Sequence, residues 1–285
     1  MRRSLGWFVR LLAFATLGAT VGAAQDVGIS TRHNAWARFQ NGAWKLVRVS
    51  TETLDESGRA ISTNVTETKT SLTRVEADGV VLEVELGVEI AGKQFDGLPQ
   101  CVKQGFHGEL VGGEVKFFPP AAAEVTIDDH KFECRKQQIE ISGELGRTAV
   151  DVYYSDTLAP YILRRQSKTT DSADKVVSET LSEVVALDMP QRVLTDIKSV
   201  ACIKTVQKTS KGTVTTLAMS SPDVPGGVVY QTTKEADPTG RLVRRSTLEL
   251  LSFGTRPEKE RIGLFGRKRA SRLHKSTTQD GTWQK

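Results

Sequence analysis

Three cysteines and four histidines are the side chains of this sequence with the widest chemical range. A cysteine nucleophile needs a nearby histidine that lowers the pKa of the thiol, and His130 stands four residues before Cys134. On one strand these two residues share a face but lie about 13 Å apart, because each residue advances about 3.3 Å. This separation argues against thiol catalysis.

Metal binding finds equally little support in the pattern of ligands. Zinc sites use about four ligands at short, defined spacings. Asp128, Asp129 and His130 stand together before Cys134, but no second Cys or His pair completes the set. We expect the remaining histidines, including His33, in surface turns. The sequence therefore predicts no metal site.

Sequence motifs of common enzymes are also missing. The chain has no G-x-S-x-G elbow, phosphate-binding loop or dinucleotide fingerprint. A glycosidase-like pair of carboxylates stays open, because its geometry is not visible in a sequence. Trp36 and Trp44 are the tryptophans available to stack a sugar, and we expect them to close the first hairpin of a sheet. These observations favour a protein without enzymatic activity or a cofactor.

The first 24 residues have the three zones of a secretory signal peptide. Arg2, Arg3 and Arg10 are followed by an apolar stretch at 11–23, too short for a convincing membrane span. We predict cleavage after Ala24. No cysteine stands at this junction, so we expect an exported protein of the periplasm or the cell exterior, without a lipid anchor.

The last 31 residues, 255–285, contain nine Lys or Arg against three acidic residues. The whole chain carries +5, this tail +6 and the first 24 residues +3, so residues 25–254 carry −4. A mildly acidic body argues against a nucleic-acid partner. We expect either a solvated, disordered tail or one that contacts an anionic envelope surface through Arg267, Lys268, Arg269 and Arg272.

Export permits disulfide bonds, and three cysteines allow one bridge and one free thiol, or a bridge between chains. Cys101 with Cys134 would close a glycine-rich loop, where a tether helps most. Cys134 with Cys202 is the alternative pair.

The clearest strand is "LEVELGVEI", in which five apolar residues alternate with glutamates and a glycine. Alternation with a period of two places the apolar residues on one face of a half-buried antiparallel strand. The glutamates are then a solvated face. The apolar face consists of Leu82, Val84, Leu86, Val88 and Ile90.

Three segments share one turn pattern, "DESGR" at 55–59, "DSADK" at 171–175 and "DPTGR" at 237–241. An Asp can accept bonds from the backbone at the start of a turn, and Gly supplies a positive φ. Asp174 stands where the other two have Gly, and Asp tolerates this conformation better than most residues. We predict three hairpins, with Asp as a turn residue rather than a catalytic one.

The similarity extends beyond the turns, because residues 155–187 align with 221–253 without a gap. A further similarity aligns Cys134 with Cys202, so the predicted repeat is a strand, a turn, a strand, a proline corner and a hairpin. Thr66, Thr68 and Thr70 lie in a segment with few apolar residues, which predicts an edge strand or a protruding ribbon.

The segments "YYSDTLAPYILRRQSKTTDSADKVVSETLSEV" and "SSPDVPGGVVYQTTKEADPTGRLVRRSTLELLSFG" resemble exported bacterial β-proteins. Their architecture is similar to that of the periplasmic lipoprotein-carrier family, an open antiparallel half-barrel. The resemblance covers about residues 120–254 and depends on the spacing of turns. It implies a concave apolar face that shelters an acyl chain, and it transfers no site residues.

We therefore predict an all-β protein with an internally repeated antiparallel sheet at 25–254, either a curved half-barrel or a barrel-like sandwich. Its parts, about 25–120 and 121–254, are expected to be separate or one continuous sheet. The predicted function is to bind or carry an apolar, lipid-like ligand on the face of Leu82, Val84, Leu86, Val88 and Ile90. The alternative is a structural module that docks to envelope polymer or a protein through its edge hairpins and tail.

Overall fold

The structure is a computed structural model that describes residues 31–90, 92–106, 114–143, 146–257 and 264. The predicted signal peptide and the four basic residues of the tail lie outside them. After a short 3₁₀ helix, η1 (Thr31–His33), the chain forms antiparallel strands. These are β1 (Trp44–Leu54), β2 (Ala60–Val75), β3 (Gly79–Ile90), β4 (Lys93–Asp96), β5 (Gln100–Gly105), β6 (Glu114–Phe117), β7 (Ala121–Ile127), β8 (His130–Gly143), β9 (Gly146–Tyr154), β10 (Ile162–Thr170), β11 (Val176–Val193), β12 (Asp196–Thr209), β13 (Gly212–Ser220), β14 (Val228–Ala236) and β15 (Leu242–Gly254).

All of these strands belong to one sheet, in the order β4-β3-β2-β1-β15-β14-β13-β12-β11-β10-β9-β8-β6. β5 also pairs with β3, and β7 pairs with β8. β1, near the start of the chain, pairs with β15, near its end, so strands from both ends of the sequence meet in the middle of the sheet. The predicted all-β antiparallel class is confirmed, and the sheet remains open.

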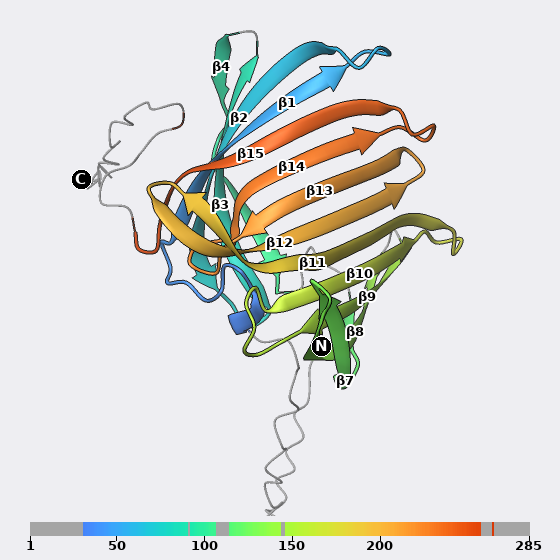
Figure 1. The fold of residues 1–285 in the computed structure, drawn as a ribbon. Helices are drawn as coiled ribbons and strands as arrows, with labels where there is room; N and C mark the ends of the chain where they lie inside the picture. Colours follow the sequence, from blue (N-terminus) through green and yellow to red (C-terminus); the bar gives the residue numbers. More distant parts are fainter. Residues whose placement is uncertain (1–30, 91, 107–113, 144–145, 258–263, 265–285) are drawn as a thin grey trace, which may run out of the picture.

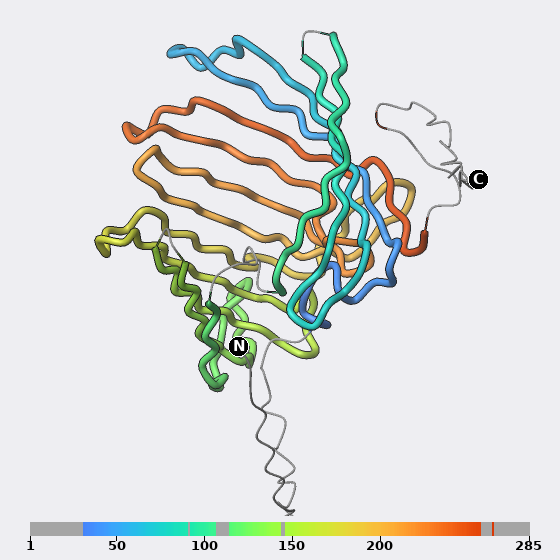
Figure 2. The backbone as a smooth tube through the Cα atoms, turned by 180° about the vertical axis from the view of Figure 1, so that it is seen from behind, coloured from blue at the N-terminus to red at the C-terminus, as the bar shows by residue number. Residues whose placement is uncertain are grey.

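The sheet is strongly curved, as Figures 1 and 2 show: the blue-green strands, β3 among them, pass behind the ends of β15–β12 in Figure 1 and in front of them in Figure 2. At one end, His33 contacts Tyr154 of β9, while Trp36 packs with Leu82 of β3. Nine strand spacings separate β3 from β9 in the sheet order, about 43 Å along the surface. Three residues reach only about 10 Å. The sheet must therefore curl around residues 33–39.

Directly paired residues share a face, so the register defines two faces across the sheet. We call the inner face the one that carries Leu86, because it is continuous with the residues around the 33–39 segment. From β3 to β8 it passes through Leu86, Thr68, Val47, Val49, Leu248, Gln231, Ala218, Ile203, Val184, Ser182, Arg165, Val152 and Gln137. The opposite surface is the outer face.

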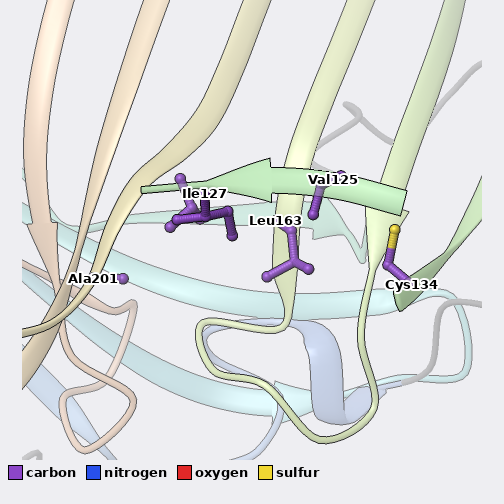
Figure 3. Close-up of a cluster of buried hydrophobic side chains, with 6 residues drawn as sticks. Val125, Ile127, Cys134, Leu163 and Ala201 are labelled. Carbon is purple, nitrogen blue, oxygen red and sulfur yellow. The ribbon is translucent and has the colours of Figure 1, made fainter. Parts of the chain in front are cut away.

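Strand β7 crosses the sheet near one end and completes a buried cluster there (Figure 3). Val125 and Ile127 of β7 pack with Leu163, Val184 and Ala201 of three neighbouring strands. The first part of β8, which follows β7 in the chain, extends beyond β9, so the β7–β8 hairpin can fold back in this way.

The three predicted turns have one geometry. The Oδ1 atoms of Asp55, Asp171 and Asp237 each accept hydrogen bonds from the backbone N–H groups two and four residues later, at 2.9–3.1 Å. The fourth turn residue has a positive φ in every case, including Asp174 at 58°. The turn role of these aspartates is confirmed.

Corresponding backbone geometry also occurs outside the turns. Ser155 donates its N–H to the carbonyl of Tyr161 at 2.8 Å, and Ser221 donates to that of Gly227 at 2.9 Å. Gly146 and Gly212 have φ of 133° and 134°. At either position an added Cβ atom would lie only 2.0 Å from a backbone carbonyl oxygen. Each pair is 66 positions apart in the sequence, like the predicted alignment of 155–187 with 221–253.

Two local predictions were wrong. Thr66, Thr68 and Thr70 do not lie on an edge strand, because β2 pairs along its length with β1 and β3. Trp36 and Trp44 do not close a hairpin: Trp36 packs on the inner face before β1 begins, and Trp44 is the buried first residue of β1. Non-local packing, which the local pattern does not report, decided both cases.

Candidate functional site

The inner face is built from aliphatic and hydroxyl side chains. Along the central strands, valines, leucines and isoleucines alternate with Thr, Ser and Gln, and most of these are half-buried rather than covered. Charges on this face gather at the strand ends: Lys45 and Arg165 lie near the 33–39 segment, and Glu235 pairs with Arg244 near the hairpin tips at 3.2 Å. The middle of the face is an open surface of low charge.

Its hydroxyl groups bond to one another across the strands. Thr205 donates to Ser182 at 2.9 Å, and the hydroxyls of Thr216 and Thr233 lie 3.1 Å apart. Buried polar groups cost free energy unless they are hydrogen-bonded. Because these groups satisfy each other, an apolar ligand can cover them at little cost.

The outer face carries the charged residues of the same strands. One row runs from Lys204 through Glu183 and Arg164 to Tyr153, and Lys136 follows. Lys136 forms a 3.0 Å ion pair with Asp151, which raises the pKa of the lysine through their hydrogen bond. Alternating charges of this kind are typical of a solvated surface.

The predicted ligand-facing stripe lies on the inner face but is divided into two parts. Leu82 is buried in a cluster with Trp36, so this end is covered. Val84 and Val88 are half-buried, whereas Leu86 and Ile90 are 40% and 49% exposed. Phe95 of β4, directly opposite Val88, is 57% exposed. The uncovered part is an apolar surface on β3 and β4.

A pocket of about 270 Å³ lies where the sheet curls around residues 33–39, and we call it the end pocket. The backbone turn that carries it is held by Asn34, whose Oδ1 accepts hydrogen bonds from the N–H groups of Trp36 and Ala37 at 2.8 and 3.1 Å. Residues of the segment, the inner face and two loops line the pocket: His33, Asn34, Ala35, Arg38, Phe106, Pro160, Ile162, Leu163, Arg165, Ser182, Glu183, Val184, Ile203, Ser220, Gly226 and Val228.

Two arginines bring positive charge to this largely apolar pocket. The Nε and Nη1 atoms of Arg38 are buried without a hydrogen-bond partner, and burial lowers the pKa of this guanidinium. Its Cζ lies 5.2 Å from the centre of the Tyr161 ring. Arg165 lines the same pocket from β10.

His33 is buried beside this pocket, 3% exposed, so the expectation of a surface turn was wrong. Its Nε2 lies 3.0 Å from Oδ1 of Asp156, and its ring packs edge-on against Tyr154. The contact lies between parts of the chain that are distant in sequence, so no local pattern indicated it.

Lys45 lies next to the pocket under Trp36. Its Nζ is 3.4 Å from the carbonyl oxygen of Gly226 and 5.6 Å from the centre of the Trp36 ring. Desolvation lowers the pKa of Lys45 to about 8.

The sequence-predicted chemical residues are not brought together. All three cysteines are free thiols, so neither predicted disulfide is formed in this structure. Cys101 is exposed on β5, while Cys134 and Cys202 lie four strand positions apart on β8 and β12. Burial raises the pKa of both latter thiols, which opposes nucleophilic reactivity.

Within the described residues, no group of three or more His, Cys, Asp or Glu side chains is placed to hold a metal ion. His130 is exposed at the β7–β8 turn. In the same part of the chain, no helix has the length and apolarity needed to cross a membrane.

Comparison with known proteins leaves the family open. No protein-family model matches the chain, and no curated protein matches it. Among solved structures, it is similar to a Bacteroides fragilis protein described as exported, with a YmcC-like fold, at 8% identity and a TM-score of 0.30. That match covers 76% of this chain and 97% of the other.

A second solved structure is a Parabacteroides distasonis protein described as a lipoprotein. Here the identity is 13% and the TM-score 0.27, over 74% of this chain and 95% of the other. Likeness of this degree supports no conclusion about function.

Proposed function

We propose that this is an exported, non-enzymatic protein that binds or carries an apolar, lipid-like ligand on the inner face of its sheet. The observation that carries the proposal is the division of chemistry between the two faces. The outer face holds alternating charges, whereas the inner face holds aliphatic groups and mutually bonded hydroxyls. Exposed apolar surface is costly in water unless a partner covers it.

The uncovered part of the face, around Leu86, Ile90 and Phe95, is where we expect the chain of the ligand. The open, curved shape of the sheet supports the proposal. A concave sheet can contact an extended apolar chain along several strands at once.

Binding of the apolar fluorescent probe 1-N-phenylnaphthylamine to the purified protein tests this proposal. Leu86→Glu should weaken probe binding about tenfold or more, because a carboxylate would lose water on contact with the ligand. Leu217 provides the matched control: it is 45% exposed on the outer face, opposite Lys204. Leu217→Glu should leave binding unchanged.

Equal effects of the two substitutions, or no probe binding by the unchanged protein, would contradict the proposal. The latter result would favour the alternative, an interaction module. The observation behind that alternative is a second apolar surface on the β11–β12 hairpin, where Met189, Leu194 and Ile197 are exposed.

A further inference from the structure

The β11–β12 hairpin extends past both of its neighbouring strands. β10 pairs with β11 only as far as Glu183, and β13 pairs with β12 only from Ala201 onward. In the described part of the chain, the strand residues of 186–200 therefore pair only with each other, up to the turn between Val193 and Asp196. We call residues 186–200 the hairpin end.

One side of the hairpin end is fixed to the body of the protein. Val193 and Val200 are 4% and 2% exposed, and they pack with Val224 and Val229. Buried aliphatic contacts of this kind hold the hairpin end in place. Its remaining side chains are presented to the solvent from a fixed position.

Large apolar side chains are exposed around the hairpin end. Ile197 is 78% exposed, Met189 43% and Leu194 41%. Ile197 pairs with Arg192 on the side opposite to the packed valines, because successive side chains of a strand alternate. Gathered apolar side chains that remain exposed mark a surface that contacts a protein or a membrane.

Leu194 occupies a turn position that a large apolar residue rarely takes. It is the first of two loop residues, and its φ is 56°. Two-residue hairpin loops usually place Gly, Asn or Asp at a positive φ, because a larger side chain is strained there. An exposed leucine costs conformational free energy at this position and gains only part of the burial of a core leucine. This cost indicates a contact outside the chain.

The charges of the hairpin end are of both signs. It contains Arg192 and Lys198 as well as Asp188 and Asp196, so its net charge is zero. Lys198 forms a 3.1 Å ion pair with Asp223. Without an excess of positive charge, the hairpin end has no electrostatic attraction to a purely anionic surface. Its mixed charges fit zwitterionic headgroups, which carry a phosphate and an ammonium group.

We propose that the hairpin end inserts Met189, Leu194 and Ile197 into the headgroup layer of a zwitterionic lipid membrane. Fluid lipids can surround side chains at the end of a narrow hairpin, whereas a protein partner needs a hollow of matching shape. Arg192, beside Ile197, can donate hydrogen bonds to lipid phosphates. The inference goes beyond the proposed function and does not require a ligand on the inner face.

Flotation of the purified protein with vesicles of phosphatidylcholine and phosphatidylethanolamine tests the inference. These lipids carry no net charge, so the basic residues of 255–285 contribute little to binding. We expect the protein to float with the vesicles. Leu194→Asn and Ile197→Asn should each lower the partition coefficient about tenfold, because each removes one apolar side chain from the lipid contact.

Ile61→Asn is the matched control. Ile61 is 66% exposed on β2, beside the β1–β2 turn, which lies at the other end of the strands from the hairpin end. This variant should leave the partition coefficient unchanged. Leu194→Asn should not lower the unfolding temperature, because Asn tolerates a positive φ. Ile197→Trp should retain binding, and its fluorescence should shift to shorter wavelength when vesicles are added.

The inference would be overturned if the unchanged protein did not float with these vesicles, or if the two hairpin variants floated equally well. Binding only to vesicles that contain phosphatidylglycerol, unaffected by both substitutions, would assign the contact to the basic tail. Self-association that Leu194→Asn removes, without vesicle binding, would assign the surface to a second copy of the chain. These failures leave the ligand proposal standing, because Leu194→Asn should not change binding of 1-N-phenylnaphthylamine.

Discussion

The inner and outer faces of this sheet are formed by the same strands, yet they differ in almost every property. Between β10 and β12 the outer row is Arg164, Glu183 and Lys204, while the adjacent inner row is Arg165, Ser182 and Thr205. Successive side chains of a strand point to opposite faces, so one strand can place charged residues on one face and uncharged residues on the other. Across these three strands most of the charges lie on the outer face, where water remains, because burying a charge on the inner face is costly.

The largest expected difference between the faces concerns their contributions to the free energy of unfolding, at the end of the sheet that curls around residues 33–39. Ile139 of β8 is fully buried on the inner face with Val150 and Val152, whereas its neighbour Gln138 is exposed on the outer face. Ile139→Ala should lower the free energy of unfolding by about 2–5 kcal/mol, because it leaves a cavity.

Gln138→Ala should change it by less than about 0.5 kcal/mol. Urea unfolding followed by circular dichroism measures both values. Similar losses for the two variants would mean that the faces are not packed differently.

Lys45 sharpens the comparison, since it places an ammonium on the inner face. Its pKa of about 8 in the folded protein lies below the ordinary value of 10.5. Below pH 8 the lysine is charged in both states, so its desolvation opposes folding. Between pH 8 and 10.5 the unfolded chain binds more protons, so stability rises with pH.

Lys45→Met should therefore increase the free energy of unfolding at pH 7 by about 1–3 kcal/mol, and this gain should disappear as the pH approaches 10.5. Lys204→Met on the outer face is the control and should change little at either pH. A gain that is independent of pH would show that packing, and not the ammonium, is responsible.

The smallest effect is expected from the ion pairs of the outer face. Lys136 and Asp151 form a 3.0 Å pair in which both side chains are about one-third exposed. A double-mutant cycle with Lys136→Gln and Asp151→Asn should give a coupling free energy below about 1 kcal/mol, reduced further by 1 M salt. A coupling of several kcal/mol that salt does not weaken would contradict the picture of a solvated outer face.

Much of the architecture was predictable because its causes are local. The alternation at 82–90 and the Asp–Gly turn pattern depend on residues a few positions apart, and the structure contains the corresponding strand and turns. The segment at Thr66–Thr70 was misjudged because its place in the sheet depends on β3, which covers its other edge.

The sequence by itself determined the strands, their two-faced pattern and the hairpin turns, since a period of two and a positive φ are properties of short segments. Only the tertiary structure decided that Leu82 is covered while Leu86 is open, and that Arg38, Arg165 and His33 gather around one pocket. The physical reason is curvature. Twist that accumulates over many strands brings β3 and β9 around residues 33–39, and no local sequence pattern indicates the total twist.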